Sequence, residues 1–187
     1  MQFNQHIAPA STLSMGDVKI GLVDERIRYS LRLKKEDLAK AKKITGWEIP
    51  AQVGASFITD KIMIVCLGPD EWMIIAQTDQ TESIVTKLRQ LDESITASIA
   101  EVSHRNMAFI IEGNDAARLL SVGCPLDVSL SAFPVGKVTR TIFENAQIMI
   151  IRTQDHVFHV ESWRSFAPYL WTFFRTVSTD FDVSMAS

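Results

Sequence analysis

The chain has 187 residues, of which 47% are hydrophobic and 22% charged, values typical of a soluble globular domain. A domain of this length buries roughly 70% of the surface that its unfolded chain exposes, so it needs neither disulfides nor a structural metal to fold. The net charge of −3 argues against a general nucleic-acid binder, which carries a basic excess.

One segment departs from this average charge. Between Glu25 and Lys43, eight basic residues stand against three acidic ones, a local excess of five that leaves −8 for the rest of the chain. Two interpretations stay open: a solvated strand edge and helix face, or a docking surface for an acidic partner.

The cysteines and the lack of targeting segments indicate the cellular compartment. Cys66 and Cys124 lack the spacing of a metal knuckle or a redox pair, and reduced thiols are typical of cytoplasmic proteins. The first residues resemble no signal peptide, and no stretch approaches the roughly 18 apolar residues of a membrane span. We therefore expect a cytoplasmic protein that binds neither membrane nor nucleic acid.

In chain order, the first expected segment is an arm. Residues 1–16 show no apolar periodicity, which predicts a flexible N-terminal arm. Alternation with a period of two over Val18–Leu22 and Ile27–Leu33 predicts a pair of strands with one buried face. The pattern of Lys34–Lys43 predicts a short helix that ends before Gly46.

Two dense apolar runs follow, and they predict strands at Lys61–Cys66 and Trp72–Ala76 joined by a Gly-Pro turn. Apolar residues at helical spacing predict an amphipathic helix over Thr81–Leu91. Two further strands, around Ile95–Val102 and Met107–Ile111, complete a strand-helix-strand unit.

In the last third, Asn114 is the expected cap of a helix over Asp115–Val122, and Gly123 suits its end. Further strands are expected at Gly136–Phe143, Ile148–Ile151 and Val157–Val160. Aromatic residues at helical spacing predict a final helix over Ser165–Val177, with Pro168 tolerated in its first turn.

Strands outnumber helices and come in adjacent pairs, which predicts an α+β fold with mainly antiparallel sheets and packed helices. Residues 17–187 are expected to form one domain, or two lobes at about 17–93 and 94–187.

No catalytic constellation emerges from the motifs. His156 and His159 lie three apart in an expected strand, where the period of two sends them to opposite faces, so they are poorly placed to share a metal. His104, in a connection, is typical of a surface histidine. The chain has no Gly-x-Ser-x-Gly elbow and no glycine-rich phosphate loop, so any flavin or nicotinamide would be held by another chain. The pair Asp70-Glu71 is typical of a solvated turn.

The aromatic residues near the C-terminus are more distinctive, because they are spread too widely for one helix to bury them on one face. They are Trp163, Phe166, Tyr169, Trp171, Phe173 and Phe174. Part of this set is ordinary core, and the remainder predicts an exposed apolar patch that a partner covers.

Three stretches are distinctive together: Cys66–Ile75 (CLGPDEWMII), Glu112–Asp127 (EGNDAARLLSVGCPLD) and Val160–Trp171 (VESWRSFAPYLW). Their order and spacing resemble the γ subunit of heterotetrameric sarcosine oxidase. Phe133–Gly136 and Thr139–Thr141 fall where that family has a similar loop and strand, and the resemblance extends over roughly residues 18–177.

The resemblance implies a non-catalytic gamma subunit in a complex with alpha, beta and delta subunits. Such a complex oxidises sarcosine to glycine, makes hydrogen peroxide and transfers the one-carbon unit to tetrahydrofolate. It implies no cofactor in this chain: FAD, FMN, NAD and tetrahydrofolate are expected on other subunits, and zinc on the smallest. It also implies a fold similar to part of the folate-binding domain of the glycine-cleavage aminomethyltransferase, and related N-methyl amino acid dehydrogenases contain a similar small chain.

Three hypotheses follow. The first is a structural subunit that contacts its partners through a turn and through the C-terminal segment. Both contain Trp, Tyr or Arg, the residues in which the binding energy of interfaces concentrates. The expected contact residues are Pro69, Asp70, Trp72, Trp163, Arg164, Phe166, Tyr169 and Trp171. The second is a stand-alone folate-binding or one-carbon transfer domain, with Asp127 and Glu161 as candidate acids. The third is a free-standing oxidase.

Overall fold

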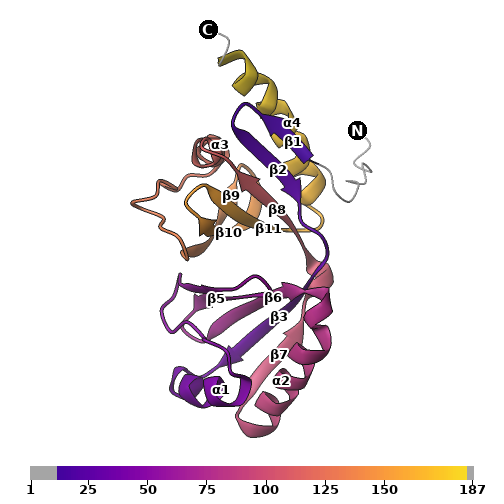
Figure 1. Ribbon diagram of the computed structural model, residues 1–187, viewed down its shortest axis with the longest axis vertical. Helices are drawn as coiled ribbons and strands as arrows, with labels where there is room; N and C mark the ends of the chain where they lie inside the picture. The colour runs from indigo at the N-terminus through magenta and orange to yellow at the C-terminus, as the bar shows by residue number, and fades with distance from the viewer. Residues whose placement is uncertain (1–11, 185–187) are drawn as a thin grey trace. The chain divides into compact units, whose positions relative to one another are not determined.

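The computed structural model describes residues 12–184, which divide into two compact units (Figure 1). The terminal unit holds the residues up to Asp24, His104–Val135 and those from Arg140 on. The central unit holds Glu25–Ser103 with Gly136–Thr139. These units differ from the expected lobes at about 17–93 and 94–187, because the first strands join the C-terminal half of the chain.

The terminal unit is built on a six-stranded sheet with the order β1-β2-β8-β11-β10-β9 (Figure 1). Its strands are β1 (Thr12–Met15), β2 (Val18–Leu22), β8 (Asn106–Glu112), β9 (Val138–Phe143), β10 (Ala146–Gln154) and β11 (Val157–Trp163). The pairings β1–β2, β2–β8, β8–β11 and β10–β11 are antiparallel. Its helices are α3 (Ala116–Gly123) and α4 (Ala167–Ser184).

Helices α3 and α4 cover one face of this sheet, where the apolar core of the unit lies. Phe158 and Val160 of β11 point into that core, so His159 and Glu161, which alternate with them, lie on the opposite face. Pro168 occupies the first turn of α4, as expected, where its missing N–H breaks no helical hydrogen bond.

The central unit is built on a five-stranded sheet with the order β4-β5-β6-β3-β7. Its strands are β3 (Arg26–Leu33), β4 (Ser56–Ile58), β5 (Ile62–Gly68), β6 (Glu71–Gln77) and β7 (Ala97–Glu101). Its helices are α1 (Leu38–Thr45) and α2 (Thr81–Ser94), preceded by the short 3-10 turns η1 (Lys35–Asp37) and η2 (Thr78–Gln80). Residues 136–139 join this unit, since the amide of Val138 donates to Gly54 O (2.8 Å).

Helices α1 and α2 pack on one face of the five-stranded sheet and enclose its core (Figure 1). Helix α1 ends at Thr45, and the next residue, Gly46, donates its amide to Lys42 O (2.8 Å) and turns the chain out of the helix with a φ of 70°. The predicted helix end before Gly46 is confirmed. A third 3-10 turn, η3 (Ser103–Arg105), precedes β8. The prediction of an α+β fold with mainly antiparallel sheets is confirmed.

Two local predictions are wrong. Val18–Leu22 and Ile27–Leu33 are strands but not a pair, because β2 pairs with β1 and β8 while β3 pairs with β6 and β7. Asn114 is not the cap of α3: Asp115 holds that position, and the Asn114 amide group donates to the carboxylate of Asp17 instead.

The N-terminal arm expected over residues 1–16 lies mostly outside the described residues. Its last part, Thr12–Met15, is not an arm but strand β1, which pairs with β2 in the register Leu13↔Ile20. None of the described helices is both long and apolar enough to cross a bilayer.

Candidate functional site

The first group of expected contact residues surrounds the turn between β5 and β6. Pro69 and Asp70 are exposed, and the Asp70 carboxylate accepts a hydrogen bond from the Arg32 guanidinium (3.3 Å). Trp72 is only 1% exposed, and its indole N–H donates to Pro50 O (2.7 Å). Trp72 is therefore a core residue of the central unit, and it has no part in an exposed surface of this chain.

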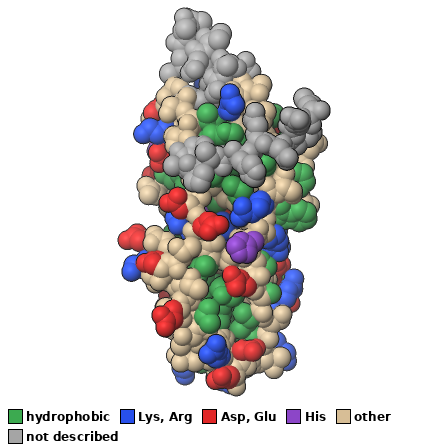
Figure 2. Space-filling model, turned by 90° about the vertical axis from the view of Figure 1, so that its right-hand side faces the viewer, with side chains coloured by type: hydrophobic (Ala, Val, Ile, Leu, Met, Phe, Trp, Pro, Cys, Tyr) green, Lys and Arg blue, Asp and Glu red, His purple; other side chains and the backbone are tan. Residues whose placement is uncertain are grey.

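Most basic residues of the segment Glu25–Lys43 are engaged within the central unit. Arg28 is buried and donates to Arg26 O (3.0 Å), and Lys40 donates to Ser94 O (2.7 Å). Lys42 pairs with Glu48 (2.5 Å). Figure 2 shows acidic and basic side chains interspersed over the face that it presents. These contacts favour a solvated face with local pairing over a docking surface for an acidic partner.

The second group of expected contact residues begins at the end of β11. Trp163 is 48% exposed, and its ring lies 6.1 Å from the ring of the half-buried Phe166. Arg164 is exposed, and its Nε atom donates to His104 O (3.2 Å). The backbone continues the strand pairing for one more residue, since the Arg164 amide donates to Arg105 O (2.9 Å). This segment is thus held by its backbone and presents its side chains outward.

The aromatic residues of α4 are more enclosed. Trp171 is half-buried and stacks on Phe109 of β8, with ring centroids 6.2 Å apart and planes at 13°. Tyr169 is also half-buried against the core, while Phe174 is buried and meets Phe109 edge-on at 5.7 Å. The prediction that part of this set is ordinary core is confirmed, and Trp163 is the member of the set that stays most exposed.

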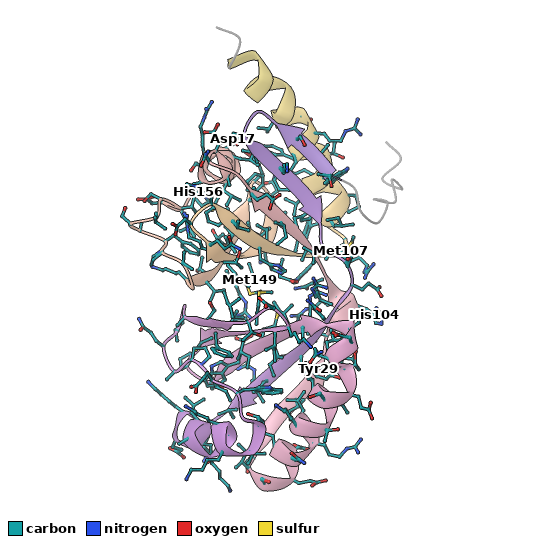
Figure 3. All side chains as sticks on the ribbon, in the orientation of Figure 1. Asp17, Tyr29, His104, Met107, Met149 and His156 are labelled. Carbon is teal, nitrogen blue, oxygen red and sulfur yellow. The ribbon has the colours of Figure 1, made fainter. Side chains whose placement is uncertain are left out.

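The three histidines in the described part of the chain, His104, His156 and His159, lie in three different elements. His104 lies in η3, and His156 lies in the turn between β10 and β11 rather than in a strand (Figure 3). His156 lines a shallow pocket of about 440 Å³ with Val135 and residues 153–157. Among residues 12–184, no group of three His, Cys, Asp or Glu side chains is placed to hold a metal.

A buried polar cluster on β8 and β11 was missed by the sequence analysis. The two oxygens of Glu161 are both engaged, since Oε1 lies 2.8 Å from Nε2 of His159 and Oε2 accepts from Nδ2 of Asn106 (3.0 Å). All three side chains are buried. The signal was the spacing of two between His159 and Glu161, which in a strand places both side chains on one face.

A buried cation on the helix-covered face was also missed. Arg152 of β10 is 2% exposed, donates to the backbone carbonyls of Val128 and Asp155, and lies 4.3 Å over the ring of Phe158. Burial lowers the pKa of its guanidinium, and the charge of Asp155 opposes this shift. Arg152 therefore ties the loop between α3 and β9 to the sheet, because Val128 lies in that loop.

Asp127, the other candidate acid, lies exposed in the same loop. Its Oδ1 accepts the backbone amide of Ser129 (2.9 Å), which is the main reason that the pKa of its carboxyl lies below the ordinary value. Its neighbour Val128 is anchored to Arg152 on the helix-covered face, whereas Glu161 lies on the opposite face. The structure therefore does not bring the two candidate acids together.

The hydrogen bond at Asp127 predicts a measurable difference between folded and unfolded chains. Since the folded-state pKa is lowered, the bond stabilises the loop above the unfolded pKa, and this contribution is lost as the pH falls through the folded pKa. An NMR titration of the Asp127 carboxyl carbon should give a lower pKa in the folded chain than in urea. Equal pKa values in the folded and the urea-unfolded chain would show that the hydrogen bond from the Ser129 amide does not form in solution.

A model of the family described as sarcosine oxidase, gamma subunit, matches residues 37–180. The chain belongs to this family. A curated gamma subunit of sarcosine oxidase from Corynebacterium sp. (strain U-96) is 26% identical to it over 121 residues, which cover 64% of this chain. The chain spans 56% of the length of that relative.

Solved structures agree on the fold of this gamma-subunit family member. A chain of the heterotetrameric sarcosine oxidase from Corynebacterium sp. U-96, solved with pyrrole 2-carboxylate, matches with a TM-score of 0.78 at 23% identity, covering 88% of this chain and 85% of that one. Aminomethyltransferase T of the glycine cleavage system from Bartonella henselae matches with a TM-score of 0.66 at 11% identity, covering 86% of this chain and 46% of that one. The resemblance to the aminomethyltransferase fold is thereby confirmed.

Proposed function

We propose that this chain is the non-catalytic gamma subunit of a heterotetrameric sarcosine oxidase-like complex. The complex converts sarcosine, oxygen and tetrahydrofolate to glycine, hydrogen peroxide and 5,10-methylenetetrahydrofolate. The observation that carries the proposal is the family match over residues 37–180, which takes in most of both units. The likeness to a chain of the heterotetrameric Corynebacterium enzyme supports the same assignment at the level of the fold.

Its partners in this proposal are the alpha, beta and delta subunits, and FAD, FMN, NAD and tetrahydrofolate bind to the other chains. The hydrogen bonds of Glu161 support this division of labour, since both of its carboxylate oxygens are engaged by side chains of this chain. We place the complex in the cytoplasm, which agrees with the two buried free thiols, Cys66 and Cys124.

The proposed contacts lie in two places, the exposed turn at Pro69 and Asp70 in the central unit and the C-terminal segment in the terminal unit. In that segment, Trp163 and Arg164 are exposed, while Phe166, Tyr169 and Trp171 are half-buried. An exposed tryptophan beside an arginine has the composition of an interface hot spot. Trp72 is left out of these contacts because it is buried.

Replacing the two tryptophans should separate assembly from folding. Trp163→Ala should change the free energy of unfolding by less than about 0.5 kcal/mol, because the side chain is half in solvent, but it should weaken assembly about tenfold. Trp171→Ala should cost about 2 kcal/mol of stability, since it removes a ring stacked on Phe109. Urea unfolding of the lone chain and affinity for the other subunits measure the two effects. A Trp163→Ala variant that unfolds the lone chain would contradict this assignment.

The assembly itself is tested by co-expression with the genes for the other subunits. A tagged form of this chain should recover a stable yellow four-chain complex that oxidises sarcosine. The lone chain should be colourless and inactive. If the tagged chain is recovered alone while the other three subunits form an active enzyme, the proposal is wrong. If the complex oxidises another N-methyl amino acid and makes no peroxide, the complex is a related dehydrogenase instead of a sarcosine oxidase.

A second candidate, a stand-alone folate-binding or one-carbon transfer domain, is favoured by the fold likeness to aminomethyltransferase T. The described geometry favours it less, because Asp127 and Glu161 are not brought together and Glu161 is engaged by His159 and Asn106. Calorimetry of the lone chain with tetrahydrofolate decides between the two. Saturable heat at micromolar ligand would support this candidate, and its absence would remove it.

A further inference from the structure

A small surface of the terminal unit combines two exposed arginines with an aromatic pair, of which one ring is exposed and the other half-buried. We call it the Arg-Trp surface and define it as Arg105, Trp163, Arg164 and Phe166. The fold brings it together where β8 begins and β11 ends, since Asn106 and Trp163 are partners in the sheet register. The hydrogen bond from the Arg164 amide to Arg105 O (2.9 Å) extends this pairing and sets the two arginines side by side along the backbone.

The charged residues of this surface are its two arginines. Residues 102–111 and 162–179 contain three arginines and no acidic residue, within a chain whose net charge is −3. Of the neighbouring acids in the terminal unit, Glu161 is buried and engaged by His159 and Asn106. Asp24 is exposed and follows Val23, whose amide donates to Ala108 O of β8 (2.8 Å). Neither Arg105 nor Arg164 forms an ion pair with a side chain in the described part of the chain. The positive charges of the two arginines are therefore not neutralised by an ion pair with a described side chain of this chain.

Both arginines are exposed, and a hydrogen bond from the Nε atom of each holds its guanidinium in one orientation. Arg105 donates from Nε to Oδ1 of Asn106 (3.3 Å), and Arg164 donates from Nε to His104 O (3.2 Å). A guanidinium held in this way keeps its two terminal nitrogens for a carboxylate, and less side-chain entropy is lost when that carboxylate binds.

The aromatic pair gives the same surface an apolar part. The ring of Trp163, 48% exposed, leans on Phe166 at an angle of 32° between the planes. An amphipathic ring of this kind binds the apolar part of a partner side chain, whereas the arginines bind acidic groups. A bare anion would use only the arginines, so a polypeptide with both kinds of side chain suits the surface better.

We propose that the Arg-Trp surface docks an acidic segment of a partner polypeptide in the complex, with carboxylates on Arg105 and Arg164 and an apolar side chain on Trp163. This inference rests on the proposed function, because it assumes that the chain works in an assembly. It adds the chemistry of the partner and assigns a role to Arg105, which the sequence did not single out.

Charge reversal tests the electrostatic part. The variant Arg105→Glu/Arg164→Glu should bind the other subunits at least about tenfold more weakly than the wild type, and added salt should weaken the wild type more than this variant. The matched control is Lys43→Glu/Arg89→Glu, which makes the same charge change at exposed positions of the central unit. The control should bind like the wild type, and urea unfolding should show that both variants are folded.

Cross-linking identifies the occupant directly. The conservative variant Arg164→Lys should keep assembly, and a carbodiimide should then join the introduced amine to an Asp or Glu carboxylate of the partner. Mass spectrometry of the linked peptide names the segment. Lys43, treated in the same complex, should give no comparable link to a partner chain.

The outcomes separate this inference from the proposed function. If the wild-type complex forms and the double charge reversal assembles equally well, the inference is overturned and the gamma-subunit assignment stands. If the wild-type chain joins no complex, both fail. If the Arg164→Lys link joins two copies of this chain, or if charge reversal only disrupts a dimer of the lone chain, the occupant is a second copy and the inference is overturned.

Discussion

Replacing Gly113 with alanine should destabilise the terminal unit by about 4 kcal/mol, the largest effect that we expect from a single methyl group. Gly113 has a φ of 121°, and a Cβ there would lie 1.7 Å from the backbone oxygen of Asp17. In Figure 3, Asp17 lies at the β1–β2 turn beside α3. The backbone of that turn passes over Gly113, and no side-chain rotation can relieve the clash.

Thermal unfolding measures this effect, and Gly46 supplies the control. A loss of about 4 kcal/mol corresponds to a fall of about 10 °C in Tm for a chain of this size. Gly46 also has a positive φ, 70°, but a Cβ there would meet nothing within 4 Å. Gly46→Ala should therefore cost only about 1 kcal/mol. Equal losses in the two variants would show that the close approach of Asp17 is not the cause.

Arg152→Met should cost about 3 kcal/mol, because it leaves two carbonyl groups without their donor inside the terminal unit. Those carbonyls belong to Val128 and Asp155, and methionine can replace the stem of Arg152 over Phe158 but not its hydrogen bonds. The loop between α3 and β9 should loosen first, which hydrogen exchange at residues near Val128 would detect.

The matched control for Arg152 is Lys19→Met, which removes a cation from an exposed position of β2 in the same unit. It should change the free energy of unfolding by less than about 0.5 kcal/mol. Urea unfolding compares the two variants. If Arg152→Met is as stable as Lys19→Met, the guanidinium does not hold the loop, and its burial needs another explanation.

Much of the local structure follows from the sequence because the cause is itself local. The alternation at Val18–Leu22 predicts the strand that forms, and the helical spacing within Thr81–Leu91 predicts most of α2. Gly46 is expected at a helix end because only a residue without a side chain accepts that φ at little cost. The final helix is likewise foreseen from its aromatic spacing, with Pro168 in the first turn.

The candidate site was predicted less completely. The C-terminal segment was expected as a mixture of core and exposed aromatics, and the exposure of Trp163 agrees with this. Arg105, which contributes to the Arg-Trp surface, carries no signal in the sequence, because its relation to Arg164 arises from the pairing of β8 with β11. Trp72 was expected at a surface, yet its indole reaches Pro50 O in the core, a contact that spans 22 positions.

By itself, the sequence determined most of the strands and all four helices, the apolar faces of the main ones, and the family to which the chain belongs. It missed the short strands β1 and β4. Only the tertiary structure decided which strands pair. A period of two tells which side chains are buried, but every strand offers the same backbone donors and acceptors to either neighbour. Strands β2 and β3 are therefore adjacent in sequence yet lie in different sheets, and β2 pairs with a strand some ninety residues away. The need for glycine at position 113 also arises only in the tertiary structure, because the atom that excludes a side chain there is the backbone oxygen of Asp17, far away in the sequence.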